Sequence, residues 1–149
     1  MRLLIQRVNH ASVKVDGEVI GNIGKGFLVL VGIGQNDTRE IADKYMKKML
    51  GLRIFEDENE KLNLSLMDIK GEILSISQFT LYANCKKGRR PSFLDAAKPE
   101  ISKPLYEYFN KALENAGVYT ETGIFGAMMK VSLINDGPTT IILDSKEII

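Results

Sequence analysis

The sequence predicts an α+β domain in which a mostly antiparallel sheet of about eight strands curls into a barrel, with two main helices packed on it. Three observations support this fold: short apolar runs with strand patterning, two longer segments with helical spacing, and turn residues between them. With 149 residues, of which 44% are hydrophobic, the chain is long enough to bury a sizeable core. We expect a single domain over residues 1–149.

The first predicted elements are strands joined by tight turns. Residues 3–8 form one strand, and the alternation in residues 11–15 indicates a second. Asp16–Gly17 then favours a type I′ hairpin, because both positions of that turn need residues that tolerate positive φ. Residues 18–23 form the return strand. The continuous apolar run 27–31 is typical of a strand buried on both faces.

A helix follows, with a start that resembles a capping box formed by Asp37 and Glu40. Gly51 is a suitable stop for this helix. Residues 52–55 look like a short strand, and the acidic stretch 56–60 fits a solvated turn better than a metal site. The apolar residues at helical spacing are Ile41, Tyr45, Met49 and Leu52.

The central strand is predicted at residues 72–76, and its pattern changes just beyond its end. Leu74 and Ile76 hold even positions with Ser75 and Ser77 between and after them, whereas Phe79 and Leu81 hold odd positions. A strand cannot change phase in this way without a bulge, a bend or burial on both faces. Bulges are frequent next to active sites, so both a functional site and an ordinary core strand fit this pattern.

The last third combines a loop, a helix and two strands. Residues 84–98 lack periodicity, and long loops in compact domains are often functional. The second helix ends at Gly117. Because a proline disrupts a helix interior, Pro104 places the regular start near Lys103, with residues 99–102 as a lead-in. The packed face of this helix comprises Ile101, Leu105, Tyr108, Phe109, Ala112, Leu113 and Ala116. The closing strands are residues 129–134 and 139–143, separated by residues 135–138.

Composition excludes several classes of function. The formal net charge of +1 provides no overall attraction to nucleic acid, so any such binding must be local. The single cysteine, Cys85, cannot form an internal disulfide, which fits a reducing cytosol. The apolar run at the N-terminus is too short for a signal peptide or a membrane span. We expect a cytoplasmic protein with no membrane partner and no DNA partner.

Familiar catalytic constellations are missing. One histidine and one cysteine cannot assemble a His/Cys metal cluster, so we expect no metal and no cofactor. His10 is expected at the surface, in a turn after the first strand, and a Ser-His-Asp arrangement built on it is disfavoured. The chain contains neither a Gly-x-Gly-x-x-Gly motif nor a phosphate loop.

Three features remain as candidates. Ser77–Thr80 offers hydroxyls and backbone N–H groups suited to an oxyanion, an effect of about 2.7–4 kcal/mol per donor. A cluster of four cations follows, which fits either phosphate contact or a solvated loop. Gly137–Pro138 lies between two strands, where X-Pro bonds are usually trans. The cations of the cluster are Lys86, Lys87, Arg89 and Arg90.

These residues also resemble a known family, that of D-aminoacyl-tRNA deacylase (D-tyrosyl-tRNA deacylase). The resemblance covers nearly the whole chain. Its two signature motifs are Ser77–Leu81 and Asn135–Pro138, which are highly specific when they occur together in this order. The further matching segments are Leu4–Val8, Ala11–Val13, Arg53–Phe55, Arg90–Phe93, Thr122–Gly123 and Phe125–Gly126.

The resemblance implies an ester hydrolase that acts as a homodimer of barrel-like subunits, with its active site at the subunit interface. The family cleaves the ester that joins a D-amino acid, or glycine, to the 3′-terminal ribose of tRNA. The Gly137–Pro138 bond would be cis and would reach into the partner's pocket. Its main-chain carbonyls would crowd the side where an L-amino acid carries its side chain, so that the wrong enantiomer is rejected.

The resemblance also implies roles for individual residues. Ser77 and Gln78 would shape the pocket, and Gln78, Phe79 and Thr80 would act through backbone N–H groups while the ribose 2′-hydroxyl assists the attack. Phe125 and Met129 would pack the terminal adenine, although such residues are also common in an ordinary core. The tRNA phosphates would be met by Lys86, Lys87, Arg89 and Arg90.

This chain departs from the family pattern in the same region. Ile124 stands where the family usually has a basic residue, and Met128 stands where a polar residue is frequent.

Two other functions remain open. Thr80 could be the covalent nucleophile of an esterase that uses a lysine base, or the chain could be a non-catalytic module that binds RNA ends.

Overall fold

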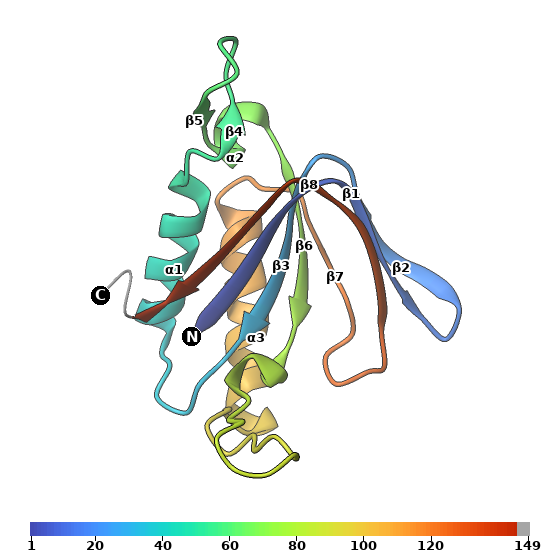
Figure 1. Cartoon of the computed structure of the whole chain (residues 1–149), viewed down its shortest axis with the longest axis vertical. Helices are drawn as coiled ribbons and strands as arrows, with labels where there is room; N and C mark the ends of the chain where they lie inside the picture. The colour runs from blue at the N-terminus through green and yellow to red at the C-terminus, as the bar shows by residue number, and fades with distance from the viewer. Residues whose placement is uncertain (146–149) are drawn as a thin grey trace.

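The protein is a strongly curved sheet with two helices lying side by side along one face (Figure 1). The computed structural model describes residues 1–145. The strands are β1 (Arg2–Val15), β2 (Glu18–Ile23), β3 (Gly26–Gly32), β4 (Phe55–Glu56), β5 (Leu62–Leu64), β6 (Glu72–Ser77), β7 (Thr120–Thr122) and β8 (Lys130–Asp144). The helices are α1 (Arg39–Gly51), α2 (Leu66–Ile69) and α3 (Pro99–Asn115), with a 3₁₀ helix, η1, at Phe79–Tyr82.

The main sheet has six strands in the order β2-β1-β3-β6-β7, and β8 pairs with the other edge of β1. The N-terminal half of β1 pairs with β3 and its C-terminal half with β2, while β8 follows both halves. Contacts of β2 with β6 and β7 bring the far edges together, so the sheet nearly closes into a barrel. The predicted α+β barrel with about eight strands and two main helices is therefore confirmed. The sheet is mixed, because β6 runs parallel to both β3 and β7.

Two apolar clusters pack against the sheet, one on each of its faces. One lies between the sheet and the helices, where the rings of Phe27 and Phe55 stack with centroids 5.3 Å apart. Its other large buried side chains include Leu3, Ile5, Tyr45, Met49, Phe109 and Leu113. The second cluster lies inside the curl of the barrel and comprises Val8, Ala11, Val13, Ile23, Leu28, Leu74 and Ile76. Alternate residues of the same strands thus supply both cores.

The hairpin expected at Asp16–Gly17 is present, with φ of 50° and 82° at its two residues. The expectation of two separate strands before it is wrong, because β1 is continuous. Its pairing with β8 shifts register between Gln6 and Val8 and again between Val8 and Ala11. Bulges of this kind let one long strand bend without ending. His10 consequently lies exposed within the strand and not in a turn.

The two strands expected at the C-terminal end are likewise one strand, β8. Val8 pairs with Asn135 and Gln6 pairs with Thr140, so four residues of β8 bulge out opposite Arg7. The bulge contains the Asp-Gly-Pro turn signal. A turn motif and a bulge share the same residue preferences, which is why the sequence pattern suggested an interruption.

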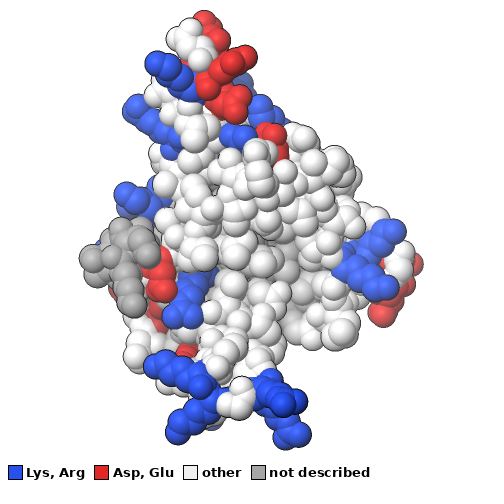
Figure 2. All heavy atoms as spheres, viewed as in Figure 1, with Lys and Arg blue, Asp and Glu red and all other residues white. Residues whose placement is uncertain are grey.

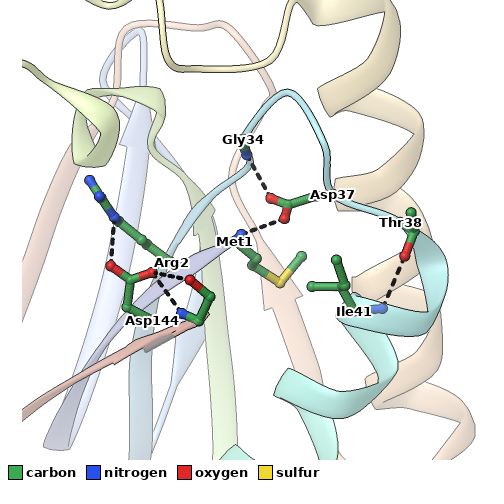
Figure 3. A network of polar contacts seen from close by, with 8 residues as sticks. Met1, Arg2, Gly34, Asp37, Thr38, Ile41 and Asp144 are labelled. Atoms are coloured by element: carbon green, nitrogen blue, oxygen red, sulfur yellow. Dashed lines mark hydrogen bonds and ion pairs between the residues drawn. The ribbon is translucent and has the colours of Figure 1, made fainter. Parts of the chain in front are cut away.

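Thr38 is the N-cap of α1, since its hydroxyl accepts a hydrogen bond from the Ile41 N–H (Figure 3). The capping role expected of Asp37 is wrong, because that carboxylate is used elsewhere. One of its oxygens lies 2.5 Å from the Met1 ammonium, and the other accepts from the Gly34 N–H at 2.6 Å. Asp37 thereby links the start of β1 to the loop that follows β3.

Helix α3 begins at Pro99, four residues before the start predicted at Lys103. Proline is well suited to the first helical position, where no intrahelical partner exists for an N–H. Pro104 lies inside the helix, but the carbonyl it deprives of a partner belongs to Glu100, an exposed residue of the first turn. Ile101 is 49% exposed and so does not belong to the packed face, contrary to expectation. No helix within residues 1–145 is long and apolar enough to cross a membrane.

The change of pattern after residue 76 has a simple structural cause. β6 is buried on both faces and ends at Ser77, and the chain then turns into η1. The residues after Ser77 therefore follow the period of a 3₁₀ helix and not that of a strand. The three-residue strand β7 was not predicted, because so short a segment carries no measurable alternation.

The acidic stretch is a turn between β4 and β5, as expected. The N–H groups of Lys61 and Asn59 hydrogen-bond the Asp57 carboxylate and lower its pKa. The short strand before it is Phe55–Glu56 and not residues 52–55. Among the described residues, no three His, Cys, Asp or Glu side chains lie close enough together to hold a metal ion.

The close approach of β3 to β6 predicts the effect of a single methyl group. A Cβ at Gly26 would lie 1.8 Å from the Glu72 carbonyl oxygen, so Gly26→Ala forces the two parallel strands apart. We expect a loss of about 3 kcal/mol in the free energy of unfolding, measured by urea denaturation.

Gly51→Ala is the matched control. A Cβ at Gly51 meets no atom within 4 Å, and the residue lies in the last turn of α1. The control should gain about 0.5–1 kcal/mol, because alanine favours the helix. Equal stability of Gly26→Ala and the wild type would contradict the close pairing of β3 with β6.

Candidate active site

A cleft of about 640 Å³ opens where the parallel strands β3, β6 and β7 end. Ligand sites in sheets with parallel strands favour this edge, because side chains and loops from several strand ends converge there. The cleft is lined by the ends of β3 and β6, the start of η1, the loop between η1 and α3, the start of α3, the segment after β7 and the start of β8. The predicted site residues among the lining are Ser77, Gln78, Phe79, Phe125 and Met129.

The end of β6 places the first three of these residues. The Gln78 N–H donates to the Val31 carbonyl at 2.8 Å, which continues the β3–β6 pairing by one residue. This N–H is therefore already used within the fold, contrary to the expectation that Gln78 acts through it. The Leu81 N–H then donates to the Gln78 carbonyl and starts η1. In a helix the first N–H groups have no partner within the helix, so those of Phe79 and Thr80 are available as donors.

Thr80 lies beside the cleft but does not line it. Its side chain is exposed, and its hydroxyl oxygen accepts a hydrogen bond from the Gln78 amide. An amide N–H can orient a hydroxyl but cannot remove its proton. The geometry thus provides no base for Thr80 within its own hydrogen bond.

One wall of the cleft comes from the loop between η1 and α3. The Phe93 ring meets the Phe79 ring edge-on, with centroids 5.1 Å apart and an interplanar angle of 77°. The Ala97 N–H donates to the Ile33 carbonyl at 2.9 Å, and Ala96 pairs with Gly34. Since Gly34 is also bonded to Asp37, this wall is attached to the network in Figure 3.

The opposite wall is the segment after β7. Phe125 and Met129 are half-buried, and Phe125 packs partly against the main core while its other side faces the cleft. The two departures from the family pattern lie here as well. Met128 also lines the cleft and is 91% exposed, and Ile124 is 49% exposed. The rim on this side is therefore apolar.

The predicted cationic cluster lies in an exposed loop directly after η1. Reciprocal hydrogen bonds between the backbones of Asn84 and Ser92, 2.8 and 2.9 Å long, close the base of this loop. Figure 2 shows basic side chains gathered at the lower end of the molecule, where Figure 1 places the loop, with a largely uncharged surface above them. Its four cations are Lys86, Lys87, Arg89 and Arg90.

Gly137–Pro138 does not line this cleft. The peptide bond between the two residues is cis, and both are exposed on the bulge of β8. The buried Arg7 guanidinium holds the bulge by donating to the Asp136 carbonyl at 3.2 Å and to the Ile54 carbonyl at 2.7 Å. The Asn135 amide donates to the carbonyls of Arg7 and Thr139, both at 3.0 Å.

The cleft is electrostatically sparse. Of the described residues that line it, only Lys98 has an ionisable side chain. Lys98 is the N-cap residue of α3, and Ser102 reaches the cleft one turn later. Sequence patterns did not identify either residue, because a lysine and a serine near a helix start are common on any surface. The arrangement offers backbone donors and apolar walls, but no acid–base pair.

Comparisons with known proteins identify the family of the chain. A family model described as D-Tyr-tRNA(Tyr) deacylase matches residues 4–144. The chain is 62% identical over 144 residues to a D-aminoacyl-tRNA deacylase of Lactobacillus acidophilus, covering 97% of this chain and 99% of the relative. It is 57% identical over 147 residues to the protein of that name from Thermus aquaticus, covering 99% and 97%.

Solved structures have the same fold. One, titled "c-Myc DNA Unwinding Element Binding Protein", superposes with a TM-score of 0.91 at 43% identity and covers 97% of this chain and 99% of its own. Another, titled as the structural analysis of a probable eukaryotic D-amino acid tRNA deacylase, has a TM-score of 0.83 at 18% identity, with 95% and 97% coverage. The resemblance drawn from the sequence motifs is confirmed. The chain belongs to the D-Tyr-tRNA(Tyr) deacylase family of hydrolases.

Proposed function

We propose that this protein hydrolyses the ester between a D-amino acid, or glycine, and the 3′-terminal ribose of tRNA, releasing the free amino acid and the tRNA. The observation that carries the proposal is the cleft at the end of β6, where backbone donors of η1 meet apolar walls without an acid–base pair. Family membership supports the reaction class. We assign the reaction to the cytoplasm, where tRNA is charged and used.

In the proposed mechanism the N–H groups of Phe79 and Thr80 receive the negative charge that develops on the ester carbonyl oxygen. Water adds to the carbonyl carbon, and the bond to the ribose 3′-oxygen breaks. The neighbouring 2′-hydroxyl accepts a proton from the attacking water as it passes its own proton to the departing 3′-oxygen, so that it ends the step as a hydroxyl. Ser77 and Gln78 shape the pocket around the ester and the α-amino group.

The residues that line the cleft are consistent with a mechanism in which the tRNA assists its own hydrolysis. The substrate's 2′-hydroxyl takes the place of an acid–base pair from the protein, and the protein supplies orientation and fixed donors. Phe125 and Met129 pack against the terminal adenine, whose flat face suits a half-buried ring and a polarisable thioether. The cations of the loop after η1 meet the backbone phosphates of the tRNA.

Selectivity for the D-enantiomer is assigned to Gly137–Pro138 of a second subunit in a homodimer. The exposure of this pair outside its own cleft and the hydrogen bond from Arg7 to the adjacent Asp136 carbonyl support the assignment. Exposed isoleucines on β8, Ile134 and Ile142, offer an apolar surface on the same strand for the partner subunit. Main-chain carbonyls of the pair reject an L side chain without contacting the D side chain.

A covalent mechanism through Thr80 is the second candidate, favoured by the exposure of its hydroxyl near the cleft. The hydrogen bond that this hydroxyl accepts from Gln78 weighs against it, since no base is supplied. A non-catalytic module that binds RNA ends is the third, and the cationic loop is what favours it.

The first prediction from the proposed function concerns the two enantiomers of the esterified amino acid. At equal, low enzyme concentration, label should be lost from D-tyrosyl-tRNA and retained on L-tyrosyl-tRNA, because only the L side chain meets the carbonyls of the partner's bulge. Acid-precipitable counts measured over time give both rates.

Gly137→Ala is the companion variant. Its Cβ would lie 2.6 Å from the Thr139 nitrogen, at a φ of +118° that disfavours an L-residue, so the bulge must change shape. We expect it to lose selective cleavage. Equal cleavage of both esters by the wild type would contradict the assigned selectivity, and stable binding without cleavage would favour the RNA-end module.

The second prediction separates the two mechanisms. A D-tyrosyl ester on tRNA that ends in 2′-deoxyadenosine should be cleaved at least about 100-fold more slowly, since it lacks the assisting hydroxyl. Thr80→Val should leave the rate on normal tRNA within about tenfold, because its backbone N–H remains. An acyl-enzyme trapped by mass spectrometry, together with full activity on the deoxy substrate, would establish Thr80 as the nucleophile instead.

The third prediction concerns the cationic loop. Alanine at all four cations should weaken tRNA binding and reduce the slope of log K against log salt by about 0.7–0.9 for each phosphate that the loop no longer neutralises. A control variant with alanine at Lys44, Lys47, Lys48 and Lys111 removes as many exposed charges from α1 and α3. An equal change of slope in both variants would show that the loop does not bind the phosphates specifically.

A further inference from the structure

We infer that Tyr106 is a positioning residue for the proposed hydrolysis, whose hydroxyl holds the end of β6 so that Ser77 and Gln78 keep their place beside Phe125. The inference rests on the proposed function and deepens it. Tyr106 belongs to α3 and does not line the cleft. It would act through the residues that do.

The Tyr106 hydroxyl binds β6 at the point where the pairing of β6 with β7 ends. β7 pairs with β6 only as far as Thr122 opposite Ser75, and a last, long contact of 3.4 Å joins the Gly123 N–H to the Ser75 carbonyl. At this same carbonyl the Tyr106 hydroxyl donates a hydrogen bond of 2.7 Å. Beyond Ser75, β6 continues to Ser77 without further pairing to β7. On this side of the strand, the Tyr106 side chain from α3 supplies the contact instead.

Tyr106 is 3% exposed, and its surroundings keep it neutral. Burial raises the pKa of its hydroxyl, while the nearby polar groups of Ser75, Asn110 and the Ser77 backbone act in the opposite direction. A phenol with a raised pKa stays protonated at neutral pH and remains a donor. It can hold the strand, but it is not poised to exchange a proton with substrate.

The ring of Tyr106 has a separate role. Its centroid lies 6.1 Å from that of Phe125, in a tilted arrangement. Ser102 precedes Tyr106 by one helical turn, and its side of α3 faces the cleft. One side chain therefore supports the proposed adenine wall through its ring and the strand of the proposed oxyanion site through its hydroxyl. The two roles can be separated by substitution.

Tyr106→Phe keeps the ring and removes the hydroxyl. We expect kcat on D-tyrosyl-tRNA to fall by about tenfold, with KM within about twofold, because the strand end loses its hydrogen bond while the adenine wall stays. Tyr106→Leu removes both, and KM should rise as well. Amide hydrogen exchange at Ser77 and Gln78 should quicken in Tyr106→Phe, a readout that needs no activity.

Tyr108→Phe is the matched control. It makes the same chemical change on the same helix, where the hydroxyl donates to the Asp43 carboxylate at 2.9 Å, between α3 and α1. It should leave kcat and exchange at the end of β6 unchanged. Wild-type kcat in Tyr106→Phe, or an equal fall of kcat in both variants, would overturn the inference while the wild type still cleaves the D-ester. Failure of the wild type to cleave that ester would overturn the proposed function, and the inference with it.

Discussion

The position of β6, parallel to β3 on one side and to β7 on the other, is the constraint on which the cleft depends. Parallel neighbours align their C-terminal ends, so three separate segments of the chain deliver their next residues to the same edge. The pairing also explains why β6 is buried on both faces and why it approaches β3 too closely at Gly26 for any side chain there. Strand pairing, and not a cluster of charged side chains, therefore builds this site.

The chemistry follows from what such an edge can supply. Strand ends provide backbone N–H groups with fixed directions, and the helix and loop around them provide apolar walls. The cleft contains few charged groups. Lys98 is the ionisable residue among its described lining residues, and the cationic loop lies outside the cleft. A cleft of this kind suits a substrate that carries its own hydroxyl beside the bond to be broken.

Local patterns predicted much of this architecture. The Asp16–Gly17 turn, the buried run of β3 and the helical spacing of α1 depend on neighbouring residues, so the sequence shows them directly. The motif of residues 77–80 likewise led to the cleft. The continuity of β1 and β8, the strand β7 and the role of Tyr106 depend on partners more than 25 positions away, which no short pattern contains. The helix start predicted from Pro104 was wrong, because the energetic cost of a proline inside a helix depends on whether the carbonyl that loses its hydrogen bond can reach solvent.

The length of β1 has a consequence for how the chain is made. Its partners are β2 and β3, which follow it closely, and β8, which ends at Asp144. While the protein is being synthesised, the hairpin and the first helix can form early, but one edge of β1 stays unpaired until β8 has left the ribosome. Contacts of such high sequence separation form late and slowly. Until then this edge of β1 is open to other nascent chains, so barrel closure, and with it the β8 bulge, has to wait for the synthesis of β8.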